Sequence, residues 1–340
     1  MIKMLEPFGV IDDTPVYLYT ISYGNYSASI CNFGATLIRL FVPDKNGNPV
    51  NVVCGYDSVD AYILNDSYMG AIVLPSANRI RKGQFTLNGK TYQLRINNGP
   101  NNLHSSLPGG SAQRIWRLVN YSESELTLQL EYGDGDLGFP GIRVFTVTYA
   151  LSEEGLTISY SAVSDQDTLF NPTNHSYFNL KGHGTILDHI LQINAHYFTP
   201  NDADSCPTGE IRAVENTPFD FTQPKPIGQD INQDDIQLVY GNGYDHNWMI
   251  DDFDGSLKTI AVLYCEETGI QCETLTSMPG IQVYTANYLG NEKYSKNAAV
   301  CLETQFTPDS INLDDQIKPI IKAGVPASHV TVYRFSVKES

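Results

Sequence analysis

A strict alternation of apolar and polar residues recurs along the chain and constrains its fold more than any other feature. Apolar side chains occupy every second position in the segments 126–132, 145–151 and 156–162. Successive side chains of a β-strand point to opposite faces, so this period of two predicts strands with one buried face. The connection 152–155 ends in glycine, which predicts a hairpin between the last two segments.

The rest of the sequence is also typical of β-structure. Twenty-one tyrosines and fourteen phenylalanines suit pleated, half-buried surfaces. Only the segment 58–65 has a pattern that favours a helix. We therefore predict an all-β chain of about twenty or more antiparallel strands, given the usual strand and loop lengths.

No linker, charge run or fixed-period repeat divides the 340 residues. This length could hold two domains, but all-β domains often exceed the usual domain size. The segment 199–233 is rich in proline and aspartate, and we interpret it as a long ordered loop rather than a boundary. We predict a single domain over residues 1–340, built as one large β-sandwich.

Charge and cysteine content restrict the partners and the compartment. The chain has 21 Lys and Arg against 38 Asp and Glu, a net charge of −17. This charge repels phosphate backbones and anionic lipids, so we expect no nucleic acid and no membrane partner. The six cysteines form no CxxC pair, and the N-terminal residues lack the apolar run of a signal peptide. These features predict a cytoplasmic protein with reduced thiols, no zinc ribbon and no membrane span.

Five polar motifs interrupt the strand pattern and carry the candidate chemistry. Each places an ionisable residue among apolar or aromatic neighbours: SANRI at 76–80, NNLHS at 101–105, NHSYFNL at 174–180, YDHNW at 244–248 and CLETQFTPDSINL at 301–313. Glu303 is the sharpest case, because it ends the apolar run 298–302. A lone carboxylate is costly to bury unless it is paired or has a function, so Glu303 is the first candidate for a functional residue.

At these motifs the sequence resembles the aldose 1-epimerase (galactose mutarotase) family. The resemblance covers most of the chain, because further motifs of the family lie between these five in the expected order: DGDLGFPG, PTGEI, TPFDF and PGIQVYT. It implies a large twisted antiparallel β-supersandwich of the galactose mutarotase type, which agrees with the strand pattern. It also implies interconversion of the α and β anomers of a free hexose such as galactose or glucose, with no metal and no organic cofactor.

The roles of the family's residues can be carried over onto the matching motifs. Glu303 is then the base that takes the proton of the anomeric hydroxyl, and His175 is the acid that protonates the ring oxygen. We expect this carboxylate and imidazolium to coexist, each charge favouring the other. His104 is implied as an auxiliary group near the ring oxygen. The residues implied to bind sugar hydroxyls are Asn78, Arg79, Tyr177, Asp245 and Gln282.

Structural roles are the alternatives for several of these residues. Arg79 and Asp245 could form a structural ion pair, and Glu303 could neutralise a buried arginine. His246 is expected on the strand face opposite to Asp245, in a structural role. The histidines that lie in no matching motif are interpreted as structural or surface residues: His183, His189, His196 and His329.

The chain departs from the family pattern beside the implied sugar site. Residues 74–76, LPS, stand where the family usually has a Gly-Arg pair, and two serines at 105 and 106 replace two glycines after His104. The following loop, LPGGSAQRIW, lacks the customary Gly-Phe. The acid and the base are untouched, so these changes concern the expected substrate preference more than the reaction type.

Two other classes of protein could use the same residues. One is a non-catalytic sugar-binding protein on the same fold, and the other is a glycosidase with Glu303 and Asp245 as its carboxylate pair. A sugar-binding protein has no need of both His175 and Glu303, and a His–Glu pair does not require the two carboxylates of a glycosidase. A phosphorylated sugar is disfavoured, because Arg79 is the one basic residue in a site motif. The sequence favours a mutarotase that acts on a small aldose as a monomer or homodimer.

Overall fold

The computed structural model describes residues 5–63, 67–105, 109–314 and 316–338. These residues form 28 strands, two short α-helices and five 3-10 turns. Neighbouring strands of the large sheets run antiparallel. The predicted all-β class, the antiparallel pairing and the large number of strands are therefore confirmed.

The three segments with strict alternation form consecutive strands of one sheet. They are β12 (Glu125–Tyr132), β13 (Arg143–Ser152) and β14 (Gly155–Ser164). Buried and half-buried positions alternate along the whole of β13. Ser152 pairs with Gly155 across the turn, so the predicted hairpin is confirmed.

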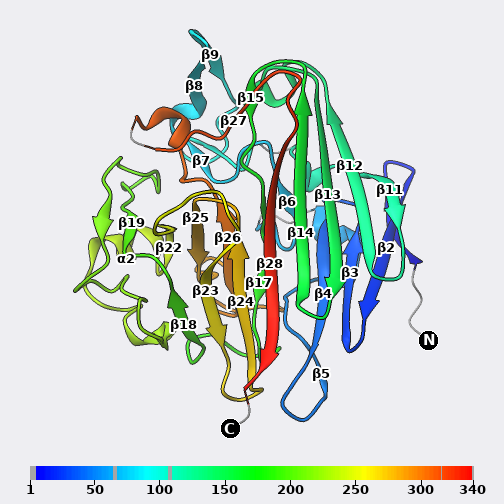
Figure 1. Ribbon diagram of the computed structural model, residues 1–340, viewed down its shortest axis with the longest axis vertical. Helices are drawn as coiled ribbons and strands as arrows, with labels where there is room; N and C mark the ends of the chain where they lie inside the picture. Colours follow the sequence, from blue (N-terminus) through cyan, green and yellow to red (C-terminus); the bar gives the residue numbers. More distant parts are fainter. Residues whose placement is uncertain (1–4, 64–66, 106–108, 315, 339–340) are drawn as a thin grey trace.

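A nine-stranded sheet runs through the middle of Figure 1. Its last long strand, β28, pairs with both β14 and β24, so it joins the two halves of the chain. The order of the sheet is β11 (Arg117–Tyr121), β12, β13, β14, β28 (Ala327–Val337), β24 (Ile270–Thr276), β23 (Lys258–Tyr264), β18 (Ile190–Ile193) and β21 (Lys225–Pro226).

A five-stranded sheet from the first part of the chain packs against strands β12 and β13. Ile21 and Ile30 of this sheet share one hydrophobic core with Leu128 and Val147. The strands, blue in Figure 1, follow the order of the sequence: β1 (Leu5–Ile11), β2 (Thr14–Tyr23), β3 (Tyr26–Cys31), β4 (Thr36–Pro43) and β5 (Pro49–Asn51).

A six-stranded sheet carries the candidate site. Its order is β17 (Tyr177–Phe178), β26 (Val300–Gln305), β25 (Gly280–Tyr284), β22 (Asp245–Met249), β19 (Tyr197–Thr199) and β20 (Arg212–Ala213). One face belongs to the main core through Leu302 and Trp248. The hydroxyl of Tyr333 in β28 donates to the carbonyl of Leu302 at 3.0 Å, which ties this sheet to the nine-stranded one. Because side chains alternate, residues such as Glu303 face the other way.

Four two-stranded sheets complete the fold, and two of them hold segments next to the candidate site. The pairs are β10 (Asn102–Leu103) with β7 (Arg79–Ile80), β16 (Thr173–Asn174) with β6 (Ile72–Val73), β15 (Thr168–Leu169) with β27 (Ile320–Ile321), and β8 (Gln84–Leu87) with β9 (Lys90–Gln93). The first pair brings the motifs SANRI and NNLHS together.

The helices are short. Helix α1 (Val59–Ile63) lies within the segment 58–65 that favoured a helix, although Asn65 lies outside the described residues. Helix α2 (Ile236–Gly241) was missed by sequence reasoning. The carboxylate of Asp235 caps it by accepting from the backbone N–H of Gln237, as N-cap residues do. Its six residues do not complete two turns, so no helical period could be detected.

The segment 199–233 contains little regular structure, in agreement with its interpretation as a long loop. It includes β20, β21 and a 3-10 turn at 227–229. The guanidinium of Arg81 holds its first part, because Nη1 pairs with Asp202 at 2.7 Å and Nη2 donates to the carbonyl of Pro207 at 2.6 Å.

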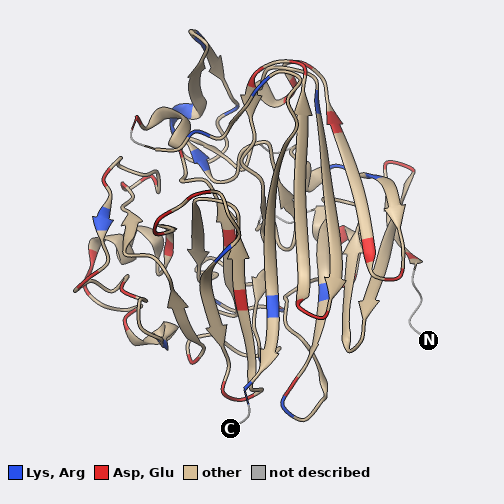
Figure 2. Ribbon diagram, in the orientation of Figure 1, with Lys and Arg blue, Asp and Glu red and all other residues tan. Residues whose placement is uncertain are grey.

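All six cysteines are unpaired and buried, as expected for reduced thiols. Asp and Glu residues, red in Figure 2, gather mainly in the loops and at strand ends. Across the described ranges, no helix is long and apolar enough to cross a membrane.

Candidate active site

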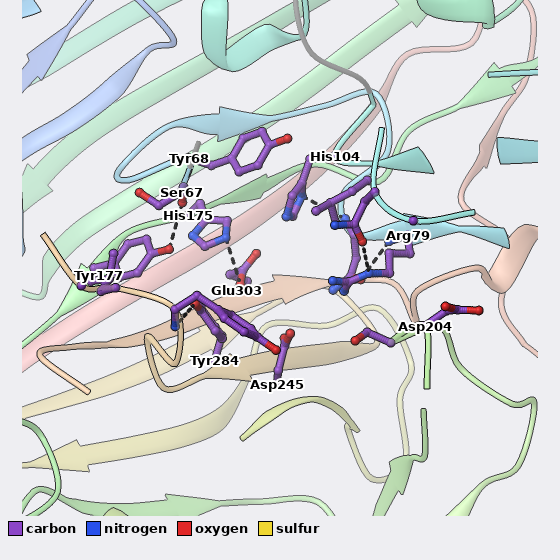
Figure 3. A pocket seen from close by; sticks show the side chains of 18 of the residues that line it. Ser67, Tyr68, Arg79, His104, His175, Tyr177, Asp204, Asp245, Tyr284 and Glu303 are labelled. Atoms are coloured by element: carbon purple, nitrogen blue, oxygen red, sulfur yellow. Dashed lines mark hydrogen bonds and ion pairs between the residues drawn. The ribbon is translucent and has the colours of Figure 1, made fainter. Parts of the chain in front are cut away.

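A pocket of about 760 Å³ lies over the core-distal face of the six-stranded sheet. Seven of the eight residues predicted from the motifs line it: Asn78, Arg79, His104, His175, Tyr177, Asp245 and Glu303. Figure 3 labels six of them, all except Asn78, and shows their side chains converging from separate strands and loops. Gln282 is the exception among the eight, because its side chain is buried and does not line the pocket.

Strand register arranges the sheet face beneath the pocket in two rows of side chains. In the first row, Asp245 of β22 pairs with Tyr284 of β25, which pairs with Cys301 of β26. Cys301 in turn pairs with Tyr177 of β17. Four strands therefore place one side chain each at the same level of the sheet.

The second row lies two residues further along the same strands. Asn247 pairs with Gln282, and Gln282 pairs with Glu303. His175 lies just before β17, two residues ahead of Tyr177, and its Nε2 is 3.7 Å from Oε1 of Glu303. The predicted acid, just before β17, therefore lies beside the predicted base on β26.

Glu303 is buried at the bottom of the pocket, with 2% of its surface exposed. Its Oε1 lies 3.7 Å from Nε2 of His175, while its Oε2 has no hydrogen-bond partner in the described part of the chain. Burial raises the pKa of Glu303 well above its usual value, the negative charge of Asp245 adds to the increase, and the positive charge of Arg79 opposes it. The alternative of an ion pair with a buried arginine is wrong, since His175, and no arginine, lies within ion-pair distance of Glu303 among the described residues.

His175 is held on several sides. Its ring stacks on Tyr177, with centroids 5.2 Å apart and an interplanar angle of 19°, and on Tyr68 at 6.0 Å and 20°. Its Nδ1 lies 3.5 Å from Sγ of Cys301. Burial lowers the pKa of His175 to about 4.

These pKa directions act against the expected pair of mutually stabilised charges. Burial raises the pKa of Glu303 and lowers that of His175, so the neutral acid and the neutral imidazole are favoured in the free site. The neutral pair and the ion pair contain the same single exchangeable proton. They differ only in which of the two residues holds that proton.

His104 is a neutral hydrogen-bond donor in this arrangement. The backbone N–H of Asn78 donates to Nδ1 of His104 at 3.2 Å, which leaves the ring proton on Nε2. Burial, together with the charges of His175 and Arg79, lowers the pKa of His104 well below its usual value.

The same tautomer bears on metal binding. Ligand atoms of His104, His175 and Glu303 lie within 4.8 Å of one another, a spacing from which a metal ion could be held. A metal-binding imidazole must offer a lone pair, however, and the Nδ1 lone pair of His104 already accepts the N–H of Asn78. The hydrogen-bond geometry therefore suits a donor better than a metal ligand.

Arg79 and Asp245 both line the pocket without an ion pair between them among the described residues, so that structural alternative is wrong. The Nε of Arg79 donates to Oδ1 of Asn98 at 3.0 Å. Oδ1 of Asp245 accepts from Nε2 of Gln282 at 2.7 Å. Burial raises the pKa of Asp245, opposed by the charge of Arg79 and by this hydrogen bond.

Three of the predicted sugar-binding residues have a side-chain group that is already hydrogen-bonded within the protein. Gln282 is buried and orients Asp245. The hydroxyl of Tyr177 donates to the carbonyl of Ser67 at 2.9 Å, so its proton is already used. The side-chain oxygen of Asn78 accepts from the backbone N–H of Arg79 at 2.8 Å.

The histidines interpreted as structural all lie away from the pocket lining. His246 faces the opposite side of β22 from Asp245, as predicted, and packs against Phe219 with ring centroids 4.7 Å apart. His189 accepts the backbone N–H of Leu180. The others are His183 and His196, which are exposed, and His329, which stacks on Phe170.

Several residues at the pocket were missed by sequence reasoning. Tyr284 could have been found, because it lies two residues after Gln282 on a strand and shares its face. Tyr68, Asp204 and Tyr288 come from loops, where no period indicates direction. Tyr288 stands at the mouth with 68% of its surface exposed.

The departures from the family pattern contact one another behind the site. The hydroxyl of Ser105 accepts from the backbone N–H of Ser76 and donates to its carbonyl, both at 2.7 Å. This clip joins the residues that precede Asn78 to the residue that follows His104. The Leu74–Pro75 peptide bond is cis. Ser106 lies outside the described residues.

A buried carboxylate facing an imidazole, at the floor of a pocket on a β-sandwich, defines an acid–base site of the kind found in enzymes. The family described as aldose 1-epimerase matches residues 17–334. Over 323 residues the chain is 38% identical to a galactose mutarotase of Bos taurus, covering 91% of this chain and 90% of that protein. It is 31% identical over 335 residues to an aldose 1-epimerase of Escherichia coli K12, with coverage of 95% and 96%.

Solved structures are similar over the same length. An aldose epimerase homologue from C. elegans has a TM-score of 0.87 at 30% identity and covers 95% of this chain and 99% of its own. A galactose 1-epimerase from Lactobacillus acidophilus has a TM-score of 0.87 at 25% identity, with 98% of both chains covered. The chain belongs to the aldose 1-epimerase family, and the predicted galactose mutarotase-like supersandwich is confirmed.

Proposed function

We propose that this chain is an aldose 1-epimerase, an isomerase that interconverts the α and β anomers of a free hexose such as galactose or glucose. Family membership supports the reaction class. The single observation that carries the assignment of residues is the placement of Glu303 opposite His175, with 3.7 Å between Oε1 and Nε2 at the floor of the pocket.

Ring opening uses the ionic form of this pair. The Glu303 carboxylate takes the proton of the anomeric hydroxyl, the bond between C1 and the ring oxygen breaks, and His175 gives its Nε2 proton to that oxygen. The products are the open-chain aldehyde, a protonated Glu303 and a neutral His175. The burial that favours the neutral pair therefore favours the protonation state of the open-chain complex.

Ring closure uses the neutral form. Rotation about the C1–C2 bond presents the other face of the aldehyde to the C5 hydroxyl. His175 then takes the proton of that hydroxyl while Glu303 returns a proton to the oxygen on C1. Each turnover moves the shared proton from one residue to the other and back, and nothing is consumed.

The other lining residues bind and polarise the sugar. His104 donates its Nε2 proton toward the ring oxygen as the auxiliary group, a role that suits its tautomer. Asp245 accepts from sugar hydroxyls, held by Gln282, and the planar guanidinium of Arg79 donates to them. The remaining members of the proposed binding set are Asn78 and Tyr177.

The broader proposal follows the same chemistry. Acid–base catalysis by side chains uses no metal or organic cofactor, and we propose none. We propose one domain over residues 1–340, acting as a monomer or homodimer, with no nucleic acid or membrane partner. Six unpaired cysteines support a reducing compartment such as the cytoplasm.

Polarimetry of freshly dissolved sugars tests the proposal. The protein should speed the decay of α-galactose, α-glucose or α-maltose to the same final rotation as the spontaneous reaction. Unchanged decay with all three, together with binding, would replace the enzyme with a sugar-binding protein. Hydrolysis of a nitrophenyl galactoside would instead indicate a glycosidase, because a mutarotase needs the free anomeric hydroxyl.

A further inference from the structure

The thiol of Cys301 contacts the imidazole of His175 at the nitrogen that the proposed reaction does not use. Cys301 has 0% of its surface exposed and is not among the pocket-lining residues. Its Sγ lies 3.5 Å from Nδ1 of His175, whereas Nε2 faces Glu303. Cys301 and Glu303, two positions apart on β26, therefore lie next to the two different nitrogens of the His175 ring.

The contact bears on which nitrogen of His175 carries the proton. In a neutral imidazole one nitrogen is a donor and the other an acceptor, and neighbouring groups select between them. Burial in the apolar surroundings raises the pKa of the Cys301 thiol well above its usual value, so the sulfur stays neutral. A neutral thiol can donate or accept a weak hydrogen bond. Because Nε2 faces the carboxyl of Glu303, whose pKa is raised, Nε2 is the acceptor on that side and the proton lies on Nδ1, facing the sulfur.

The surroundings of Cys301 fix this geometry. Tyr177 pairs with Cys301 across β17 and β26, and the same tyrosine ring stacks on His175. The ring of His175 is thus held against the sulfur from one face. Movement of the ring would break the stacking and the sulfur contact together.

We propose that Cys301 is a positioning residue for His175. Its sulfur accepts a hydrogen bond from Nδ1–H, and Nε2 remains the nitrogen that exchanges a proton with Glu303 and the sugar. This inference rests on the proposed role of His175 as the acid. It adds a residue that touches neither the substrate nor the pocket surface.

Kinetics of three variants test the role. Cys301→Ala and Cys301→Val both remove the acceptor, and the valine also fills the volume of the thiol. Each should lower kcat by about threefold to tenfold, the range for one lost hydrogen bond, with KM changed by less than about twofold. Cys301→Ser restores an acceptor and should recover part of this loss.

Cys54→Ala is the matched control. Cys54 is a buried thiol in the same hydrophobic cluster as Cys301. Its side chain has Tyr294 as its hydrogen-bond neighbour, and not a residue of the proposed reaction. Its kcat should stay within about twofold of the wild type, as for a contact outside the reaction. Equal losses in Cys54→Ala and Cys301→Val would mean that Cys301 contributes packing alone, and would overturn the inference.

Nitrogen-15 NMR of the imidazole gives a second readout that does not depend on activity. With His175→Asn used for assignment, the wild type at neutral pH should show a protonated Nδ1 and an unprotonated Nε2. The Cys301 variants should show a mixture of tautomers. An unchanged tautomer in Cys301→Val would overturn the inference, whereas an inactive wild type with the expected tautomer would count against the proposed function.

Discussion

Glu303 and His175 share one exchangeable proton, and burial acts on both groups in favour of their uncharged forms. The carboxyl has its pKa raised and the imidazole has its pKa lowered to about 4. Sequence motifs identify both residues but not this balance, because the motif does not reveal how much solvent surrounds each group. Burial is a property of the folded chain.

The shared proton predicts the pH dependence of turnover. A second proton binds to the pair as pH falls through the lowered pKa of His175, about 4, so the rate should drop at the acid end. The pair loses its only proton as pH rises through the raised pKa of Glu303, which produces the alkaline limb. Stopped-flow polarimetry across pH checks this profile, and a rate that climbs steadily into strong alkali would contradict it.

His104 is a neutral hydrogen-bond donor, so we expect it to contribute less to catalysis than His175 does. An asparagine at either position keeps an N–H donor but cannot exchange a proton. We expect His175→Asn to lower kcat by about a hundredfold or more, as for a lost general acid, and His104→Asn by roughly tenfold. Polarimetry of both variants, with circular dichroism to verify folding, checks the order. An equal or larger loss at His104 would exchange the two roles.

Among the strands, register decides which residues meet. Two pairs of residues are each two positions apart in the sequence: Cys301 with Glu303, and His175 with Tyr177. In an extended chain the two members of such a pair point to the same side, so a common face for each pair could be predicted. The pairing of Tyr177 with Cys301 could not, because the two strands are separated by more than a hundred residues. The opposition of acid and base is therefore a property of the sheet and not of either motif.

The serine clip behind the site predicts a measurable stability effect. Ser105→Ala leaves the buried N–H and carbonyl of Ser76 without their partner, and should lower the free energy of unfolding by about 2 kcal/mol. Ser105→Gly loses the same bonds, but glycine tolerates the backbone φ of +61° at this position. It should be more stable than the alanine variant by about 1 kcal/mol. Urea denaturation measures both, and wild-type stability in Ser105→Ala would refute the importance of the clip.

At the scale of the whole molecule, the two faces of the six-stranded sheet have different roles. One face packs in the main core, and the other carries the residues of the pocket. Alternation along the chain predicts the all-β class, because burial of one strand face is a local property. It does not predict the order of the nine-stranded sheet, in which β28 pairs with β14 from the middle of the chain. Loop residues such as Asp204 and Tyr288 reach the pocket only through this long-range arrangement. That is why sequence reasoning found the floor of the pocket but not its rim.

Replacement of the proposed base tests the account most directly. Glu303→Gln keeps the size of the side chain and its hydrogen-bonding reach while removing the carboxylate. Glu131→Gln, at an exposed position of β12, is the matched control. Calorimetry should find the affinity of Glu303→Gln for galactose little changed. Polarimetry should find its turnover lower by about a hundredfold or more, with Glu131→Gln at the wild-type rate. Anomerisation at the wild-type rate in Glu303→Gln would contradict the assignment of Glu303 as the base.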